Sequence, residues 1–257
     1  MRALWIADAH LSDPFSPVYV SLEALIDRLL PEMDSLIILG DLFEIWLGDN
    51  AILVAKHASL LDLLFKVRSQ GKDIFYLKGN HDFIIGDILS KDIGAFIFEE
   101  EALFQWDGRR ILASHGDQIN KKDYGYQILK SVLRSSPMEK AIRGFGDHLS
   151  YGIAQKLAKI ARGRPSKKKQ RDLESFSLRY AIDKLQENDA VILGHSHVVK
   201  WQVFTKGDRR RIYLNPGSWS ESRTYLWYNG GRFDLYQQGL AHPRQPKKIF
   251  DFDLSGD

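Results

Sequence analysis

Histidine, aspartate and asparagine side chains follow short apolar runs at five places in the chain. The set consists of Asp8, His10, Asp41, Asn80, His115, His195 and His197. Mixed imidazole and oxygen ligands suit Mn, Fe or Zn better than Mg or Ca. Three or four imidazoles with two carboxylates and an amide are more ligands than one ion needs. The set therefore predicts two divalent metal ions bridged by a shared carboxylate.

The spacing within this set supports one shared site. Asp8 and His10 are two residues apart, as are His195 and His197, and in extended chain residues two apart point to the same face. A single histidine beside a strand is usually a hydrogen-bonded structural residue, and an aspartate after glycine is often a turn former. Agreement of five strand ends on metal-ligand types favours the metal site over that structural alternative.

Buried strands followed by helices are expected to position these ligands. Apolar runs at 4–7, 35–39, 73–77, 110–114 and 190–193 predict strands,. Helical spacing at 20–30 and 57–67 separates the first three,. This order predicts an α/β fold with a mostly parallel sheet. In such sheets ligands collect beyond the carboxyl ends of the strands, where all seven side chains could converge.

The C-terminal part has a different pattern. Runs at 224–227 and 232–236 flank Asn229-Gly230-Gly231 and predict a hairpin,. We expect this hairpin to form a second, antiparallel layer, and the residues after Gly239 to form a strapping tail.

The segment 121–187 interrupts the alternation of strands and helices and predicts a helical insertion. Its first part, 121–171, holds 14 basic and 3 acidic residues, although the whole chain carries a net charge of only +3. An apolar stripe at helical spacing consists of Ile142, Phe145, Leu149, Ile153, Leu157 and Ile160,. A basic amphipathic helix is consistent with contact to an anionic lipid surface or with a cap over an acylated substrate. The alternative is an ordinary helix packed on the core.

Composition limits the remaining classes. A chain of 257 residues with 44% hydrophobic residues is long enough for one large domain or at most two small ones,. Cysteine is absent, which excludes thiolate catalysis and Cys-ligated metal sites. Since neither a signal segment nor a run of about 18 apolar residues is present, we expect a cytoplasmic protein. Peripheral attachment to a membrane surface stays open.

Five ordered motifs resemble those of the calcineurin-like metallophosphoesterases. They are Asp8-Ala9-His10, Gly40-Asp41, Gly79-Asn80-His81-Asp82, His115-Gly116-Asp117 and Gly194-His195-Ser196-His197. The resemblance implies a four-layer αββα sandwich of two mixed sheets, with the insertion at about 121–187 inside a single domain spanning 1–257. It also implies a two-metal site.

The resemblance assigns a role to each motif residue. One metal would take Asp8, His10 and His197, the other Asn80, His115 and His195, with Asp41 bridging. His81 would act on the phosphate as electrophile or general acid, with Asp82 orienting it. A turn-forming role for Asp82 is the alternative.

Within the family, the chain resembles the UDP-2,3-diacylglucosamine pyrophosphatases of lipid A synthesis. The similarity lies in the stretch 40–49, in 80–86, in Gly108-Arg109-Arg110 and in Asp123 followed by Gly125-Tyr126-Gln127. It implies hydrolysis of an acylated nucleotide sugar to UMP and a diacylglucosamine 1-phosphate with two divalent ions, Mn²⁺ being preferred. The substrate would contact Asp123, Tyr126, Arg164, Ser166 and Lys167.

Two departures leave alternatives open. His81 stands where well-studied members of that branch have Arg, and Asn215-Pro216-Gly217-Ser218 has the form of the wider family. A nuclease or phosphodiesterase is one alternative, because the basic insertion could follow a phosphate backbone. Its aromatic residues are not grouped as a base-stacking platform, so no nucleic-acid partner is expected. A scaffold that has lost its metals is the other, and the intact ligand set argues against it. The oligomeric state stays open.

Overall fold

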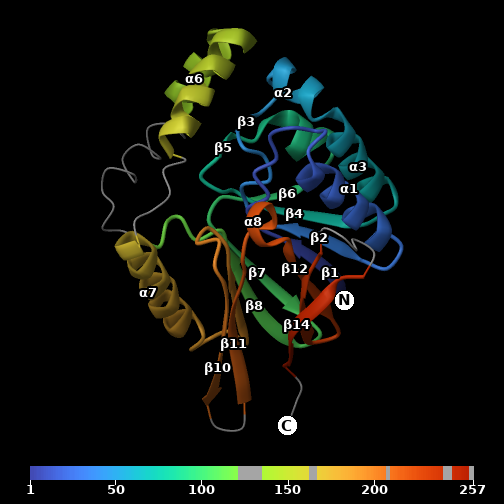
Figure 1. Ribbon diagram of the computed structural model, residues 1–257, viewed down its shortest axis with the longest axis vertical. Coiled ribbons are helices and arrows are strands. Elements are labelled where there is room, and N and C mark those ends of the chain that lie inside the picture. Colours follow the sequence, from blue (N-terminus) through green and yellow to red (C-terminus); the bar gives the residue numbers. More distant parts are fainter. Residues whose placement is uncertain (121–134, 162–166, 207–208, 240–244, 255–257) are drawn as a thin grey trace.

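A computed structural model describes residues 1–120, 135–161, 167–206, 209–239 and 245–254 (Figure 1). Among these residues, two large sheets lie face to face, with helices on the outer side of each. This is the four-layer αββα sandwich that the resemblance implies, so the predicted fold class is confirmed.

The first sheet has the strand order β14-β13-β12-β1-β2-β4-β6. Its parallel part consists of β1 (Arg2–Ile6), β2 (Ser35–Ile38), β4 (Asp73–Leu77) and β6 (Phe96–Phe98). Its antiparallel part consists of β12 (Thr224–Asn229), β13 (Arg232–Gln237) and β14 (Lys247–Asp253).

The second sheet has the order β10-β11-β9-β8-β7. Its strands are β7 (Glu101–Trp106), β8 (Arg109–Ser114), β9 (Ala190–Leu193), β10 (Val199–Lys206) and β11 (Arg209–Pro216). The central strands β8, β9 and β11 are parallel, and β7 and β10 pair antiparallel at the edges. A small parallel pair joins β3 (Trp46–Leu47) to β5 (Asp82–Ile84).

The described helices lie on the outer faces of the sandwich and at one end of it. They are α1 (Pro17–Leu29), α2 (Ala51–Lys56), α3 (Ala58–Ser69), the short η1 (Ile88–Asp92), α5 (Ser136–Gly144), α6 (Asp147–Ala161), α7 (Lys167–Lys184) and α8 (Trp219–Ser222). Helices α1 and α3 cover the first sheet, and α7 covers the second.

Side chains along each strand of the first sheet point alternately to its two faces, so one strand packs against both the helices and the second sheet. In β1, Leu4 and Ile6 face the helices, while Ala3 and Trp5 face the second sheet, because successive side chains of a strand point to opposite faces. The ring of Trp5 packs edge-on against Phe104, with ring centroids 5.5 Å apart. Strands buried on both faces read as continuous apolar runs, which is why these strands were recognisable in the sequence.

The structure confirms the five predicted strands but divides them between two sheets. The runs at 4–7, 35–39 and 73–77 lie in the first sheet as β1, β2 and β4, and those at 110–114 and 190–193 in the second as β8 and β9. The predicted hairpin exists as β12 and β13, but it extends the first sheet and does not form a separate layer. The expected tail adds β14 as an edge strand.

The described part of the insertion is helical, as predicted, but the apolar stripe does not lie on one helix. The chain breaks between α5 and α6 at Gly146, which has φ 72°. Phe145, Leu149 and Ile153 are 50%, 54% and 39% exposed, so this part of the stripe does not pack into the core. The side chains of Leu157 and Ile160 lie outside the described residues.

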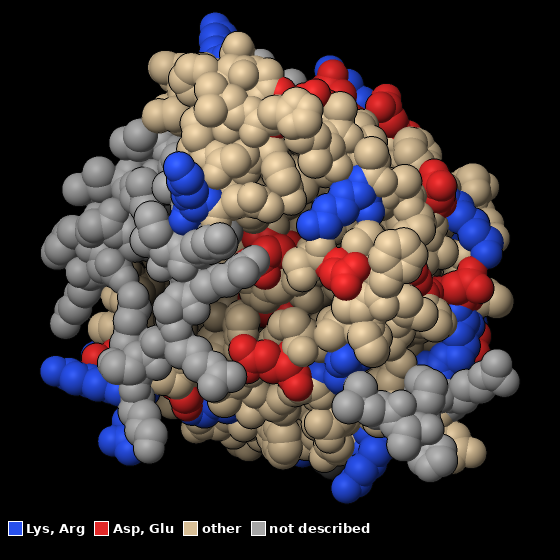
Figure 2. All heavy atoms as spheres, turned by 45° about the horizontal axis from the view of Figure 1, so that its top comes forward, with Lys and Arg blue, Asp and Glu red and all other residues tan. Residues whose placement is uncertain are grey.

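Some acidic side chains lie in a hollow at the end of the molecule that carries α6. With the top of Figure 1 turned forward, Asp and Glu side chains are visible in a hollow near the middle of the face, and the rim around it carries side chains of both charges (Figure 2). No helix among the described residues is long and apolar enough to cross a membrane.

Candidate metal centre

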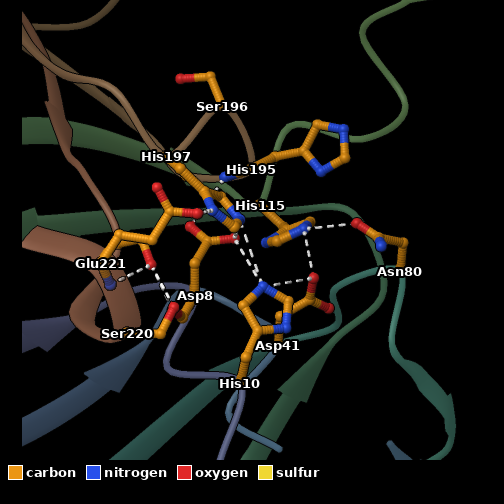
Figure 3. A network of polar contacts seen from close by, with 12 residues as sticks. Asp8, His10, Asp41, Asn80, His115, His195, Ser196, His197, Ser220 and Glu221 are labelled. Atoms are coloured by element: carbon orange, nitrogen blue, oxygen red, sulfur yellow. Dashed lines mark hydrogen bonds and ion pairs between the residues drawn. The ribbon is translucent and has the colours of Figure 1, made fainter. Parts of the chain in front are cut away.

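The seven predicted ligand residues lie together where the strands of both sheets end (Figure 3). Asp8 and His10 follow β1, Asp41 follows β2, and Asn80 follows β4 in the first sheet. From the second sheet, His115 follows β8, while His195 and His197 follow β9. The carboxyl ends of the parallel strands thus meet at one edge, as the sheet rule predicts.

Asp8, His10 and His197 form one compact group of metal-ligand atoms. His197 Nε2 lies 3.4 Å from Asp8 Oδ1 and 3.3 Å from His10 Nε2. His10 Nε2 lies 4.0 Å from the same Asp8 oxygen. These three residues are the set that the resemblance assigns to one metal.

Asp41 lies between that group and a second one. Its Oδ2 is 3.8 Å from His10 Nε2 and 3.5 Å from His115 Nε2. His115 Nε2 is in turn 3.1 Å from Asn80 Oδ1. A carboxylate between two ligand groups has the position that a bridging ligand needs.

His195 is turned differently from the other predicted ligands. Its ring lies beside His115, with centroids 5.1 Å apart, and points away from both carboxylates (Figure 3). Its backbone N–H donates to Asp8 Oδ2 at 3.0 Å. Burial, reinforced by the charge of His115, lowers the pKa of His195 to about 4, so the ring is neutral at pH 7. Its role as a ligand stays a prediction.

His81 lies next to the centre, and a backbone carbonyl group fixes the orientation of its ring. Its Nδ1 lies 2.7 Å from the carbonyl oxygen of Glu44, which can only accept, so Nδ1 carries the proton,. The other ring nitrogen, Nε2, is then free to exchange a proton with a bound substrate. With His10 and Asp41 the ring also forms a third group of possible metal ligands.

Asp82 forms hydrogen bonds within the ligand loops, and its predicted role of orienting His81 stays a prediction. Its Oδ2 accepts from the backbone N–H groups of Asp41, at 3.0 Å, and Gly79, at 2.8 Å. The hydroxyl of Tyr76 donates to its Oδ1 at 2.8 Å. Asp82 therefore holds the two ligand loops together, while the Glu44 carbonyl orients His81. This arrangement is close to the turn-forming alternative.

Backbone strain is concentrated in the predicted ligand set. Positive φ angles of 44° to 65° occur at Asp8, His10, Asp41, His195 and His197. This left-handed region costs a residue with a Cβ roughly 1–2 kcal/mol, although Asn, Asp and His enter it more often than most. Such strain is typical of sites where function fixes the side-chain direction.

Gly40 lets the second ligand loop approach the second sheet. A Cβ at this position would lie 2.6 Å from His115 Nδ1 and 2.7 Å from the backbone nitrogen of Gly79, and Gly40 has φ 85°. Because only glycine combines that angle with that spacing, the Gly-Asp pair of the motif has a structural reason.

Burial and mutual interactions shift the pKa values of the centre. Burial alone would raise the pKa of Asp8, but the neighbouring histidine rings hold it below its ordinary value. Burial would lower the pKa of His197, but Asp8 raises it to about 9. Burial, with the charge of His81, lowers that of His10 to about 3. Metal ligands must be deprotonated, so a metal entering this group would displace a proton from His197.

The donor set fits divalent metal ions. Within the described part of the chain, Asp8 Oδ1 is buried without a hydrogen bond, and its charged neighbours are the imidazoles of His197 and His10. A cation bound among these ligand atoms would satisfy the buried carboxylate oxygen. Two carboxylates, an amide oxygen and several imidazoles on adjoining groups match the mixed N/O ligands of Mn, Fe or Zn centres.

Glu221 is a polar contact of this centre that the sequence analysis missed. Its Oε1 lies 3.1 Å from His197 Nδ1, so it accepts from one ring nitrogen and leaves Nε2 directed at Asp8. The same short helix, α8, also supports Asp8, because Ser218 Oγ donates to the Asp8 carbonyl at 2.8 Å. An exposed glutamate 24 residues beyond His197 gives no signal in the sequence.

The predicted substrate-binding residues are not placed by the structure. Asp123, Tyr126, Arg164 and Ser166 lie outside the described residues. Lys167 begins α7, but its side chain is outside them too. Their roles stay predictions.

The chain is similar to several known proteins. UDP-2,3-diacylglucosamine hydrolase of Aeromonas salmonicida is 29% identical over 249 residues, 93% of this chain and 94% of that protein. The enzyme of the same name from Stenotrophomonas maltophilia is 28% identical over 91% of this chain and 98% of its own length. Among solved structures, zinc-bound Vps29 from Entamoeba histolytica covers 99% of the chain, with 15% identity and a TM-score of 0.48.

The family model for calcineurin-like phosphoesterases matches residues 1–199. That span runs from β1 through His197 and so contains every predicted metal ligand. The chain belongs to the calcineurin-like phosphoesterase family, whose members are metal-dependent hydrolases with a dinuclear centre.

Proposed function

We propose that this protein hydrolyses the diphosphate of UDP-2,3-diacylglucosamine to UMP and 2,3-diacylglucosamine 1-phosphate, using two Mn²⁺ ions. The observation that carries the proposal is the dinuclear ligand set itself, with Asp41 between its two groups. Relatives bearing this activity as their name match over more than nine tenths of the chain.

The protein's own residues supply positioning and proton transfer. Bound divalent ions would supply an activated water and neutralise the phosphoryl oxygens. His81, fixed by the Glu44 carbonyl, presents Nε2 on the side of the ligand groups. Once protonated there, it can donate to the oxygen that leaves phosphorus. Asp82 holds the loops of Asp41 and Gly79 in a fixed relative position through its hydrogen bonds to both backbones.

The acyl chains and the membrane are part of the same proposal. We expect the exposed apolar side chains Phe145, Leu149 and Ile153 of the insertion to contact acyl chains or the anionic cytoplasmic face of the inner membrane, as a basic amphipathic segment does. Asp123 and Tyr126 are predicted to contact the glucosamine-phosphate portion of the substrate. Arg164, Ser166 and Lys167 are predicted substrate contacts as well.

The test is a product analysis with purified full-length protein. With Mn²⁺ and UDP-2,3-diacylglucosamine we expect UMP and the lipid phosphate in equal amounts, and in ¹⁸O-water the label should appear in UMP. The variants Asp41→Asn and His115→Ala should reduce turnover to background while keeping the wild-type circular dichroism spectrum. Release of nucleotides from single-stranded DNA without UMP from the lipid substrate would contradict the proposal in favour of a nuclease.

A further inference from the structure

A cavity of about 150 Å³ lies beside the metal centre, between the body of the protein and the insertion helix α6. From the body it is lined by residues that follow β1 and β2 and by the end of α2. From α6 it is lined by Tyr151 and Gln155, which are four residues apart and so share one face of the helix,.

The cavity adjoins residues of the metal centre. Leu11 on its wall directly follows the predicted ligand His10. Glu44, also on the wall, accepts the hydrogen bond of His81 through its carbonyl oxygen. A group bound in this cavity would therefore lie near the side chain that is proposed to act on the phosphate.

The cavity has room for about one ring. Ordinary ligand pockets measure about 300–1,000 Å³, whereas this cavity measures about 150 Å³, and an engineered cavity of about that size holds one benzene molecule. A pyrimidine base therefore fits inside it, whereas a sugar carrying two long acyl chains does not fit inside as a whole.

The lining combines apolar and polar groups. Leu11, Ile45 and Leu53 form an apolar part. Lys56 and Gln155 add a cation and an amide on one side. An acyl chain would lie against these two polar groups without hydrogen-bonding them. A planar heterocycle with carbonyl and N–H groups on its edge can form hydrogen bonds with both.

Tyr151 and His57 complete a binding site for a base. Tyr151 is half-buried on the wall, where its ring can stack on a planar base,. His57 is 1% exposed, and its Nδ1 is 3.2 Å from the hydroxyl of Tyr19. Burial lowers the pKa of His57 to about 3, so this part of the wall is uncharged at pH 7.

We propose that this cavity binds the uracil base of the nucleotide half of the substrate, with Gln155 and Lys56 hydrogen-bonding its polar edge. The inference rests on the proposed function for the identity of the base. In this proposal the base binds between α6 and the body of the protein. The insertion then contacts the nucleotide half of the substrate as well as its lipid half.

The experiment compares two small probes by calorimetry with full-length protein in Mn²⁺. UMP carries the base, and ribose 5-phosphate lacks it. We expect UMP to bind at least about 10-fold tighter, as one or two net hydrogen bonds with stacking would give. Gln155→Ala and Lys56→Met should each weaken UMP binding about 3- to 10-fold and leave ribose 5-phosphate unchanged.

The matched control is Lys156→Met, which removes an exposed lysine next to Gln155 on α6 that does not line the cavity. Its affinity for both probes should equal that of the wild type. Equal affinity of the wild type for UMP and ribose 5-phosphate, or equal losses for both probes in Gln155→Ala and Lys56→Met, would overturn the proposal.

Hydrolysis of UDP-2,3-diacylglucosamine by the same preparations separates this inference from the proposed function. A preference for UMP without hydrolysis would keep the base site and contradict the proposed substrate. Hydrolysis without a preference for UMP would contradict the base site alone.

Discussion

His197 illustrates how single residues of the centre are held from two directions. Nε2 faces Asp8 at 3.4 Å, and Nδ1 faces Glu221 at 3.1 Å. A carboxylate behind a ligating histidine fixes the tautomer and the ring orientation, and its loss typically lowers metal affinity or activity 10- to 100-fold. Glu221 is thus a positioning residue that acts through His197.

Replacing Glu221 tests this role by metal affinity. Glu221→Ala should weaken Mn²⁺ binding about 10-fold, because the His197 ring loses its anchor. Glu221→Gln keeps an oxygen that can accept from Nδ1 and should weaken binding less. Calorimetric titration of the metal-free protein measures both, with the exposed Glu187→Ala as control. Wild-type Mn²⁺ affinity in Glu221→Ala would show that the contact is incidental.

At the residue scale, sequence reasoning selected candidate ligands that the structure brings together, but not the groups that support them. Ligand types after five strands were recognisable because strand ends converge whatever the details of the fold. The groups that anchor His81 and His197 were not recognisable in the sequence. One is the main-chain carbonyl of Glu44, and the other is the exposed side chain of Glu221 on α8. The outward turn of the His195 ring depends on packing beside His115, which no spacing encodes.

At the scale of elements, one asparagine links the insertion to the body. Asn50 caps α2 by accepting from Leu53 N–H at 3.3 Å. Its amide nitrogen donates to the Asp147 carbonyl at 3.0 Å and to Ser150 Oγ at 3.1 Å, both on α6. The wall of the cavity that α6 provides therefore depends on this side chain.

Asn50→Asp separates the two roles of the residue. The carboxylate keeps the acceptor for the cap but cannot donate to Asp147. We expect α2 to stay intact and amide hydrogens of 150–156 to exchange several-fold faster, as the loss of about 1 kcal/mol of hydrogen bonding allows. Asn188→Asp, which removes a similar bond to Lys184 within α7, should leave α6 unchanged. Unaltered exchange across α6 in Asn50→Asp would contradict this linkage.

Predicted elements were correct where a strand is buried on both sides. The strands missed were β3, β5, β6, β7, β10, β11 and β14. In β7 exposed and buried residues alternate, and the outer half of the β10–β11 hairpin is polar, so neither forms a continuous apolar run. The sequence also did not predict how the five strands divide between two sheets. The order of strands along the chain shows which strands are neighbours in sequence, but not which strands pair in space.

At the scale of the whole molecule, the centre joins the two sheets. Asp8, His10, Asp41 and Asn80 come from one sheet, and His115, His195 and His197 from the other. A metal bound by both sets would tie the sheets together at the edge where the inter-sheet core ends. Because such a ligand binds the folded state alone, it stabilises by about 2.7 kcal/mol at 100 times its Kd.

Metal should therefore raise the melting temperature. We expect Mn²⁺ to increase the Tm of the wild type by several degrees, and chelation to reverse the increase. In Asp41→Asn the increase should largely disappear, since the oxygen shared by both ligand groups loses its charge. Differential scanning calorimetry at fixed protein concentration measures both. An equal rise in wild type and variant would place the stabilising metal elsewhere.

The left-handed backbone conformation of the predicted ligand residues creates a trade-off between stability and catalysis. Five positions keep an unfavourable conformation that glycine would adopt without cost,. A library selected for heat resistance alone would drift toward glycine at these positions and lose its ligands. Selection for turnover would oppose that drift, because glycine has no side chain that could bind a metal ion.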